Sequence, residues 1–319
     1  MILEVAFIAI YALGVGTISS MVGIGGGIFN TPLLMIIFLL SAQVAPATAL
    51  VAALFLAVAS TFAYWRQNPR PIIAKAGLFL AITTTPGSLI GVFLRTLIEN
   101  DYVLRLIFGL SLMPIAIKML FAVKRERGDI VSELADYSIS DIADKRLAIS
   151  LFGAFIGGVA AGLLGIGGGA IIVPVLSILM GLPMHAAVAT SMFTMVFTAS
   201  AGTAMNLVSG YINPYFAISL GLGMLIGAQL GARLACKVNS VQLKRVFGLI
   251  LVFPLVKMMK LGQIWLDPMD TSVLVSTVGD ILIWLFIVIP IGLFRLYQLR
   301  KQSLEPAVRK EPCDPLTPE

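Results

Sequence analysis

The chain has 319 residues, of which 59% are hydrophobic and 12% are charged, and its mean hydropathy is +1.00. More than half of any folded surface is already apolar, so a soluble fold could not hide this excess and part of it must face lipid. The composition excludes a cytosolic enzyme, a nucleic-acid-binding domain and a secreted disulfide scaffold, and the net charge of +6 is expected at the membrane surfaces.

The apolar residues are grouped into long tracts separated by short polar stretches. A bilayer core about 30 Å thick takes about 20 residues of helix to cross, and a lone strand cannot satisfy its backbone in lipid. The sequence therefore predicts an all-α integral membrane protein built as a polytopic helix bundle. The apolar tracts run over 5–40, 44–64, 72–94, 103–122, 147–180, 184–209, 215–235, 246–261 and 271–294.

The first and fifth tracts are too long for one crossing and too short for two. Each contains the same glycine cluster, and glycine favours torsions outside the right-handed helical region. We predict a Gly-broken helix in each tract: one full helix, a break, and a short helix that does not span. Thr31 is expected to cap a short helix that starts at Pro32 and ends near Leu40, and Pro174 is expected to start the second short helix.

The glycine clusters belong to an internal repeat. The string Val22–Gly27 recurs at an offset of 142 residues as Leu164–Gly169, and the same offset relates Thr48 to Thr190. Because these matches stay in register, the repeat indicates a duplication of the chain. The predicted segments are a first transmembrane repeat over 1–122, a cytoplasmic linker over 123–146, a second transmembrane repeat over 147–261, an extra C-terminal helix over 262–299 and a cytoplasmic tail over 300–319.

The loop charges predict that the two repeats are inverted. The loop after the Thr48 helix is cationic and is expected in the cytoplasm, whereas the equivalent loop 209–214 is uncharged and is expected outside. Equivalent loops on opposite faces are common among secondary transporters. The basic tail places the C-terminus in the cytoplasm, and the first residues lack the features of a removable signal peptide. We therefore predict a multi-pass protein of the plasma (inner) membrane.

The broken helices predict an anion-binding site. A helix that begins inside the membrane points free N–H groups and the positive end of its dipole at the break, so two facing helix starts would hold an anion near the midplane. Basic side chains are not assigned to this site: Arg95, Lys118, Arg233, Lys257 and Lys260 lie near tract ends and are expected to snorkel to the interface. The alternative is that the glycines are close-packing sites between helices.

Hydroxyl and amide side chains around each break are expected to complete the site, because hydroxyl groups donate hydrogen bonds to oxyanions. The alternative for each Ser or Thr is a bond to its own helix. The predicted substrate-binding residues are Gly25, Gly26, Gly27, Asn30, Thr31, Thr48, Gly167, Gly168, Gly169, Thr190, Ser191 and Asn206.

Two ionisable residues are candidates for coupling transport to a proton. His185 is the one histidine, although its place after Pro183 also fits a solvated helix start. Asp280 lies about ten residues into the last tract, where a carboxylate is costly unless it is paired, and the alternative is a shorter span with Asp280 near the interface. Cys236 and Cys313 form no metal motif, so neither a metal nor a cofactor is predicted.

Other large side chains are interpreted as structural. Tyr64 and Trp65 fit an aromatic belt at the membrane interface. Met195 and Met224 fit ordinary packing between helices.

The double glycine motif resembles a known family. Gly23–Gly27 with Pro32, and Gly165–Gly169 with Pro174 and the following His185–Ser191, resemble the sulfite exporter TauE/SafE family, also called the 4-toluene sulfonate uptake permease family. The resemblance covers about residues 5–261. It implies an integral plasma-membrane transporter that moves small sulfur-containing anions such as sulfite, sulfoacetate or other organosulfonates.

The first half departs from this pattern. Gln43 and Ala49 stand where the second half has His185 and Ser191, so a role given to Ser191 need not have a symmetric partner.

We therefore predict a secondary membrane transporter of small sulfur-containing anions that works by alternating access. An anion channel and a carrier of a different small anionic metabolite are the alternatives. An enzyme is not predicted, because one histidine and few carboxylates in the apolar tracts offer no catalytic constellation. The predicted partners are the anionic solute and the lipid bilayer, with no nucleic acid and with a homo-oligomer left open.

Overall fold

The computed structural model describes residues 2–98 and 144–235, a few isolated positions between 103 and 113, and position 282. All regular elements within these residues are helical, and five of the helices are long and apolar enough to cross a membrane. The predicted fold class is therefore confirmed. Three predicted tracts (103–122, 246–261 and 271–294), most of the linker and the tail lie outside the described residues. The helices are α1 (Ile2–Val22), α2 (Gly27–Ile36), α3 (Val44–Trp65), α4 (Ala74–Leu97), α7 (Asp144–Leu164), α8 (Gly169–Pro174), the π-helical segment η2 (Val175–Leu179), α9 (Met184–Val208) and α10 (Pro214–Ala235).

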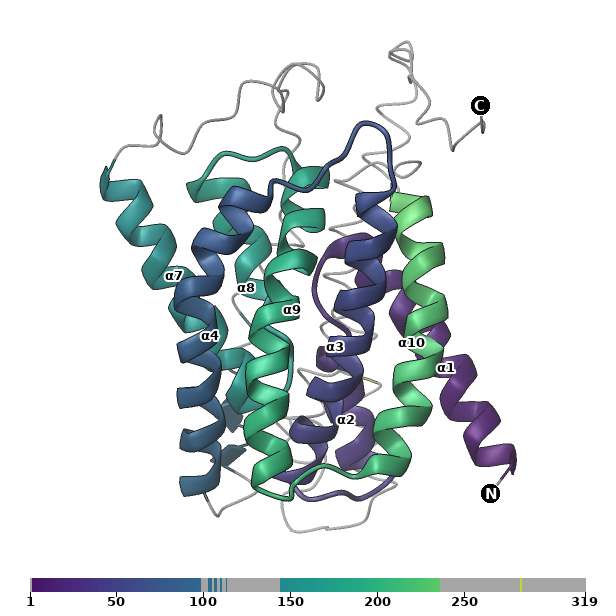
Figure 1. The fold of residues 1–319 in the computed structure, drawn as a ribbon. Helices are drawn as coiled ribbons and strands as arrows, with labels where there is room; N and C mark the ends of the chain where they lie inside the picture. Colours follow the sequence, from purple (N-terminus) through teal and green to yellow (C-terminus); the bar gives the residue numbers. More distant parts are fainter. Residues whose placement is uncertain are drawn as a thin grey trace.

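Equivalent helices of the two halves run in opposite directions. In Figure 1 α3 rises from the bottom to the top of the bundle, and α9, which lies beside it, descends. The loop that follows α3 is consequently at the top, and the loop that follows α9 is at the bottom. These two loops correspond in the sequence repeat, so the duplicated segments face opposite ends of the molecule.

Each half interlocks with the other through its outer helices. α1 lies along α10, and α4 lies along α7. A Cβ atom added at Gly91 would come 2.1 Å from the carbonyl oxygen of Val159, and one added at Gly227 would come 2.3 Å from that of Leu13. Only glycine permits such contacts between backbones, which are typical of small-residue interfaces between membrane helices. The close-packing interpretation therefore holds for the glycines along these helices.

The structure confirms a helix break at both glycine strings. α1 ends at Val22 and α2 begins at Gly27, while α7 ends at Leu164 and α8 begins at Gly169. Figure 1 shows α2 returning toward the end of the bundle at which α1 starts. The breaks therefore lie where each chain segment turns back inside the protein.

The predicted helix starts at the two prolines are wrong. The residue before α2 is Gly26, whose left-handed φ of +49° ends the break, so the helix starts at Gly27 and already contains Pro32. Helix α2 ends at Ile36, short of the expected Leu40. In the second half Pro174 is the last residue of α8, and the wider turn of η2 follows it. Proline has no N–H and crowds the carbonyl four residues earlier, which explains the change of helix type there.

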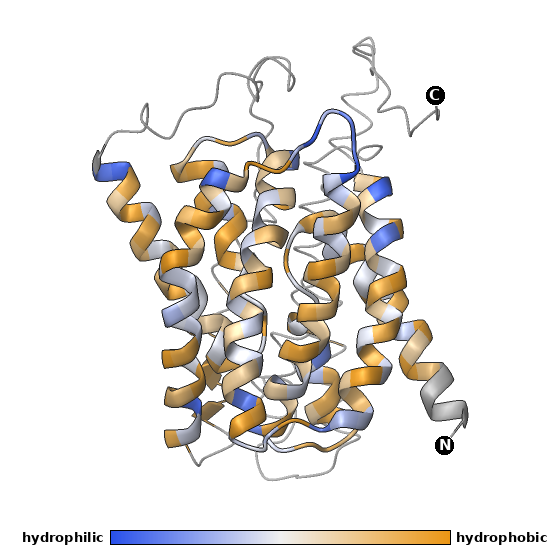
Figure 2. Ribbon diagram, in the orientation of Figure 1, coloured by the Kyte–Doolittle hydropathy of each residue, from blue (hydrophilic) through white to orange (hydrophobic). Residues whose placement is uncertain are grey.

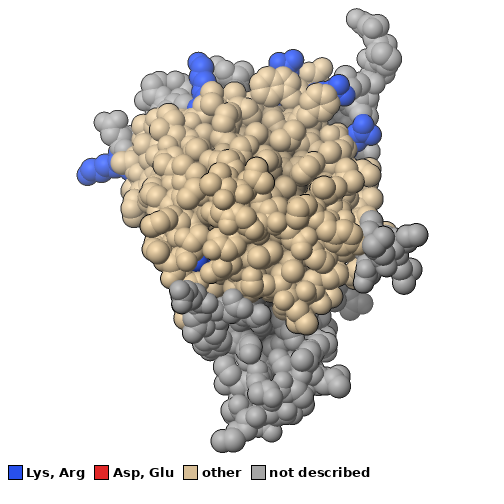
Figure 3. All heavy atoms as spheres, turned by 60° about the horizontal axis from the view of Figure 1, so that its bottom comes forward, with Lys and Arg blue, Asp and Glu red and all other residues tan. Residues whose placement is uncertain are grey.

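The cationic side chains of the described residues gather at one end of the bundle. Figure 2 shows hydrophobic helix surfaces along the middle and hydrophilic residues near the top. In Figure 3, where the bottom comes forward, most Lys and Arg atoms lie on the far rim, and the described part of the near face carries almost no charged atoms. The exposed cations at described positions are Arg66, Arg70, Lys75, Lys145, Arg146 and Arg233, and Arg95 is the buried one.

Candidate functional site

The two glycine strings cross each other at the centre of the protein. A Cβ atom at Gly27 would come 1.9 Å from the carbonyl oxygen of Gly165, and a Cβ atom at Gly169 would come 2.2 Å from that of Gly23. These two contacts are equivalent, since the repeat offset relates Gly27 to Gly169 and Gly23 to Gly165. We call this region, residues 23–27 with residues 165–169, the glycine crossing. Side chains at these contacts would force the two backbones apart.

Left-handed torsions keep the glycine crossing out of any helix. The φ angles of Gly25 and Gly26 are +85° and +49°, and those of Gly167 and Gly168 are +78° and +84°. Residues with side chains rarely adopt these torsions, so glycine is required here for conformation as well as for space. In the hydrogen bonds of the described residues, none of these four glycines acts as a backbone donor. Four buried N–H groups therefore remain available in one place.

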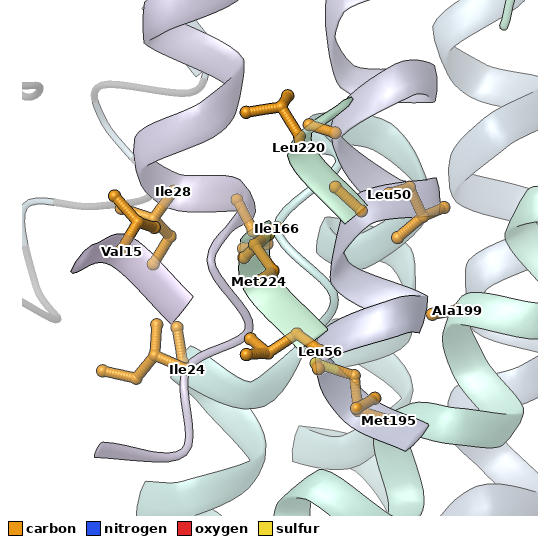
Figure 4. Packing of buried hydrophobic residues seen from close by; sticks show 14 of the residues in the cluster. Val15, Ile24, Ile28, Leu50, Leu56, Ile166, Met195, Ala199, Leu220 and Met224 are labelled. Atoms are coloured by element: carbon orange, nitrogen blue, oxygen red, sulfur yellow. The ribbon is translucent and has the colours of Figure 1, made fainter. Parts of the chain in front are cut away.

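Two methionine side chains fill the space beside the glycine crossing. The Sδ atom of Met195 would lie 2.5 Å from a Cβ atom at Gly25 and 2.6 Å from one at Gly167, so this thioether sits between the strings. Met224 packs against Gly26 and accepts a hydrogen bond from Nδ2 of Asn30 at 3.1 Å. Figure 4 shows Met224 beside Ile166 and Leu56, with Met195 nearby. Sequence reasoning assigned both methionines to general packing and missed their contact with the strings.

Thr31 and Ser191 hold the crossing together. Thr31 Oγ1 donates a hydrogen bond to the carbonyl oxygen of Leu164 at 3.1 Å, so it does not cap a helix as predicted. Ser191 Oγ lies 3.1 Å from the carbonyl oxygen of Gly23 and 2.8 Å from that of Val188. Each side chain thus bonds a backbone carbonyl at the end of the other half's full helix, which fixes where the strings meet.

Thr48 and Thr190 occupy reciprocal positions at opposite ends of the bundle. Thr48 Oγ1 accepts a hydrogen bond from the backbone N–H of Asn213, and Thr190 Oγ1 accepts one from that of Ile73, both at 3.0 Å. Each threonine therefore binds the loop before the last described helix of the other half. The structure does not bring these two hydroxyl groups together with the glycine crossing.

Arg95 is buried, and the expectation that it snorkels to the interface is wrong. Its side chain is 0% exposed, and its Nη1 donates to the carbonyl oxygen of Gly162 at 3.1 Å. Its Nη2 donates to Oδ1 of Asn206, one of the predicted site residues. A signal was present in the sequence: Gly87, Gly91 and Arg95 recur at four-residue spacing on one helix face, the face that packs on α7.

Polar side chains also meet near the cationic end. His185, the second residue of α9, is half-buried, and its Nε2 lies 3.2 Å from Oε1 of Gln67. Tyr64 is fully buried against this ring, with centroids 5.6 Å apart, so its assignment to an interfacial belt is wrong. The second coupling candidate, Asp280, lies outside the described residues. In the part of the chain that the structure describes, no group of three metal-binding side chains occurs.

The sequence is similar to a family of membrane proteins and to several proteins named as probable membrane transporters. Residues 8–258 match the sulfite exporter TauE/SafE family. A protein named "Probable membrane transporter protein YunE" from Bacillus subtilis is 30% identical over 266 residues, which cover 77% of this chain and 95% of that protein. A probable membrane transporter protein from Xylella fastidiosa is 28% identical, covering 75% of this chain and 88% of its own, and one from Methanocaldococcus jannaschii is 28% identical, covering 74% and 88%. No solved structure matches.

Proposed function

The chain belongs to the sulfite exporter TauE/SafE family of membrane transporters, and from this premise we propose that it is a secondary carrier of a small sulfur-containing anion. The proposed substrates are sulfite, sulfoacetate and other organosulfonates, and the proposed mechanism is alternating access. The anion binds at the glycine crossing, where the two broken helices meet.

The observation that carries this proposal is the set of free backbone donors at the crossing. The amides of Gly25, Gly26, Gly167 and Gly168 donate no hydrogen bond among the described residues, and all four belong to the two strings, which are in contact through Gly27 and Gly165 and through Gly169 and Gly23. A buried amide without an acceptor costs several kcal/mol in a membrane interior, so a ligand with acceptor oxygens stabilises this arrangement. The start of the ten-residue helix α2 adds its positive dipole end.

The flexible side chain of Met195 can move to make room for an anion between the two glycine strings. Met195 lies between the two strings and is fully buried. Methionine has an unbranched side chain that changes rotamer easily, so it can leave the space without a change in the backbone. In the proposed mechanism Met195 closes the crossing when no anion is bound and moves away when one enters.

The opposed halves support alternating access. α3 and α9 run in opposite directions at the centre, and each half packs its outer helices on the other half. Two such halves act as inverted repeats that rock about a fixed site, which is common in secondary transporters. The exposed cations at one end favour the cytoplasm for that side of a plasma membrane.

Reconstitution in liposomes tests the proposal. Purified protein is expected to move sulfite or a sulfonate with saturable kinetics, and unlabelled substrate on the far side is expected to stimulate exchange. Flux without saturation or exchange would identify the alternative, an anion channel. If neither sulfite nor any sulfonate moves but another small anionic metabolite does, the substrate assignment is overturned.

Leucine variants test the role of the crossing. Gly26→Leu and Gly168→Leu place a bulky side chain on left-handed backbone beside the free amides, so we expect transport to be lost. Gly14→Leu is the matched control, because a Cβ atom at Gly14 meets nothing within 4 Å. Size-exclusion profiles and thermal unfolding show which variants fold. Wild-type transport by a folded Gly26→Leu or Gly168→Leu variant would overturn the crossing as the binding site.

A further inference from the structure

A buried cationic cluster lies between α4, α7 and α9, beside the end of α7. Arg95, Asn206 and Ser88 are each 0% exposed. Arg95 bonds the Gly162 carbonyl, which lies one helical turn before the second glycine string. The cluster therefore adjoins the glycine crossing, on the side toward the uncharged 209–213 loop.

The duplicated position in the other half shows that a cation is not needed to bond this carbonyl. The repeat offset relates Gly162 to Ser20 and Asn206 to Tyr64. There the neutral hydroxyl of Tyr64 donates to the Ser20 carbonyl oxygen at 2.8 Å. A neutral hydroxyl group is therefore enough to bond the carbonyl near the end of α1. The need to bond the equivalent carbonyl of α7 does not explain why a positively charged residue is used there.

Three donors of the cluster have no acceptor in the part of the chain that the structure describes. They are Nε of Arg95, Nδ2 of Asn206 and Oγ of Ser88. Ser88 Oγ lies 2.6 Å from the position of a Cβ atom at Gly202, one turn before Asn206 on α9. Helical side chains lean toward the N-terminus, so the side chains of Asn206 and Arg95 extend back toward Gly202 and Ser88.

The charge of Arg95 has no counter-ion among the described residues. Its hydrogen-bond partners are a backbone carbonyl and an amide oxygen, both neutral, and the further side chain that interacts with its charge is the phenol of Tyr211. A guanidinium stays protonated in a protein, and a buried charge is costly unless an opposite charge neutralises it. Nε of Arg95 and Nδ2 of Asn206 can only donate and the Ser88 hydroxyl can donate as well, so the missing ligand is one that offers acceptor atoms and negative charge.

We propose that Arg95, Asn206 and Ser88 form a binding site for a small oxyanion. The planar guanidinium binds two oxygens of a pyramidal or tetrahedral sulfur oxyanion side by side, and the amide and hydroxyl groups donate to the remaining acceptors. The site is a second binding position for the transported anion, next to the glycine crossing, and in this respect it rests on the proposed function.

Thermal unfolding of the purified full chain in detergent tests the site, with sodium sulfite and sodium methanesulfonate as ligands and choline chloride as the ionic-strength control. Either ligand is expected to raise the wild-type unfolding midpoint in a saturable way. Arg95→Gln is expected to raise the half-saturating concentration by at least about tenfold, the value of one or two charge-assisted hydrogen bonds. Arg233→Gln removes the same charge at an exposed position and is expected to respond like wild type.

Asn206→Asp provides a second variant in case Arg95→Gln does not fold. It places a carboxylate on the Nη2 group of Arg95, so the protein carries its own counter-ion. The midpoint without ligand is expected to rise, and the half-saturating concentration of sulfite is expected to increase by at least about tenfold, because the Arg95 site is filled while the glycine crossing is unchanged. A merely structural Arg95–Asn206 contact would give the first effect without the second.

The outcomes separate this proposal from the carrier function. A folded Arg95→Gln or Asn206→Asp variant with the wild-type half-saturating concentration overturns the Arg95 site and leaves the liposome result untouched. Sulfite binding that depends on Arg95, in a wild-type protein that moves no anion across liposomes, supports the site and overturns the proposed carrier function.

Discussion

The two halves of the molecule make equivalent backbone contacts but carry different side chains at equivalent positions. Gly27 meets Gly165 just as Gly169 meets Gly23, and the threonines at 48 and 190 bond equivalent loops. Yet the carbonyl at the end of α1 is bonded by neutral Tyr64, and the equivalent carbonyl of α7 is bonded by cationic Arg95. The two repeats thus make equivalent contacts here, while among the described residues a cation bonds the end of α7 and a neutral hydroxyl group bonds the end of α1.

Side chains at other equivalent positions of the repeat also differ. Met224 and Leu56 pack beside Gly26 in the first half. Their equivalents in the repeat are Thr84 and Thr198, whose hydroxyl groups are hydrogen-bonded at 2.7 Å. Each pair takes one residue from each half, so at equivalent positions of the repeat an apolar pair stands where the other pair carries hydroxyl groups.

The largest loss of stability is expected from adding a methyl group at either of the two equivalent contacts of the glycine crossing. Gly27→Ala and Gly169→Ala each drive a Cβ atom into a carbonyl of the opposite string, at 1.9 and 2.2 Å. We expect each to lower the free energy of unfolding by more than about 3 kcal/mol, because backbone must move. Thermal unfolding in detergent measures this, with Gly14→Ala as the control. A large loss in one half alone would contradict equivalent contacts.

Substitutions at Met195 probe a contact that only one half provides, because the repeat offset relates Met195 to the much smaller Ala53. Met195→Ala leaves a cavity between the strings and is expected to cost about 2–4 kcal/mol of folding stability. Met195→Leu keeps the volume and is expected to cost less than about 1.5 kcal/mol. Chemical denaturation compares the two variants. Equal losses would show that the thioether does not fill this space.

Tyr64→Phe sharpens the contrast with Arg95. It leaves the Ser20 carbonyl without its recorded side-chain donor, so we expect a loss of about 1–3 kcal/mol. The response of the unfolding midpoint to sulfite is expected to stay at the wild-type value, because Tyr64 carries no charge. A loss of the sulfite response in Tyr64→Phe would mean that the hydrogen bond at the end of α1 is also needed to bind sulfite, and would contradict the contrast with Arg95.

The smallest effect is expected at the hydroxyl pair. Thr84→Val and Thr198→Val, alone and together, form a double-mutant cycle for a buried hydrogen bond. We expect a coupling free energy of about 1 kcal/mol from unfolding midpoints. A value near zero would show that the two hydroxyl groups contribute independently.

Much of the fold could be predicted from the sequence because the lipid environment leaves few choices. The lengths of the apolar tracts predicted both ends of α3, α4, α9 and α10 to within three residues. The repeated glycine strings predicted both helix breaks. The starts of the short helices were missed, because the torsions of Gly26 and Gly168 decide them before the chain reaches a proline. Local proline and cap preferences carry no information about that geometry.

The candidate site was less predictable, because its geometry depends on contacts between distant segments. The repeat predicted two helix starts that face each other near the midplane, but not the direct contact between the backbones of residues 23–27 and 165–169. Arg95 was misplaced for a related reason: a cation near the end of a tract is usually at the interface, and only its alignment with Gly87 and Gly91 indicates a buried face. Thr48 and Thr190 were grouped with the strings although they bind loops.

The most direct test of the glycine crossing is a crystal structure of the protein grown with selenite, whose selenium replaces the sulfur of sulfite and scatters anomalously. We predict an anomalous peak within hydrogen-bond distance of the amides of Gly25, Gly26, Gly167 and Gly168, with the Met195 side chain displaced. Selenite that is bound only at the protein surface, with Met195 still between the strings, would contradict the account.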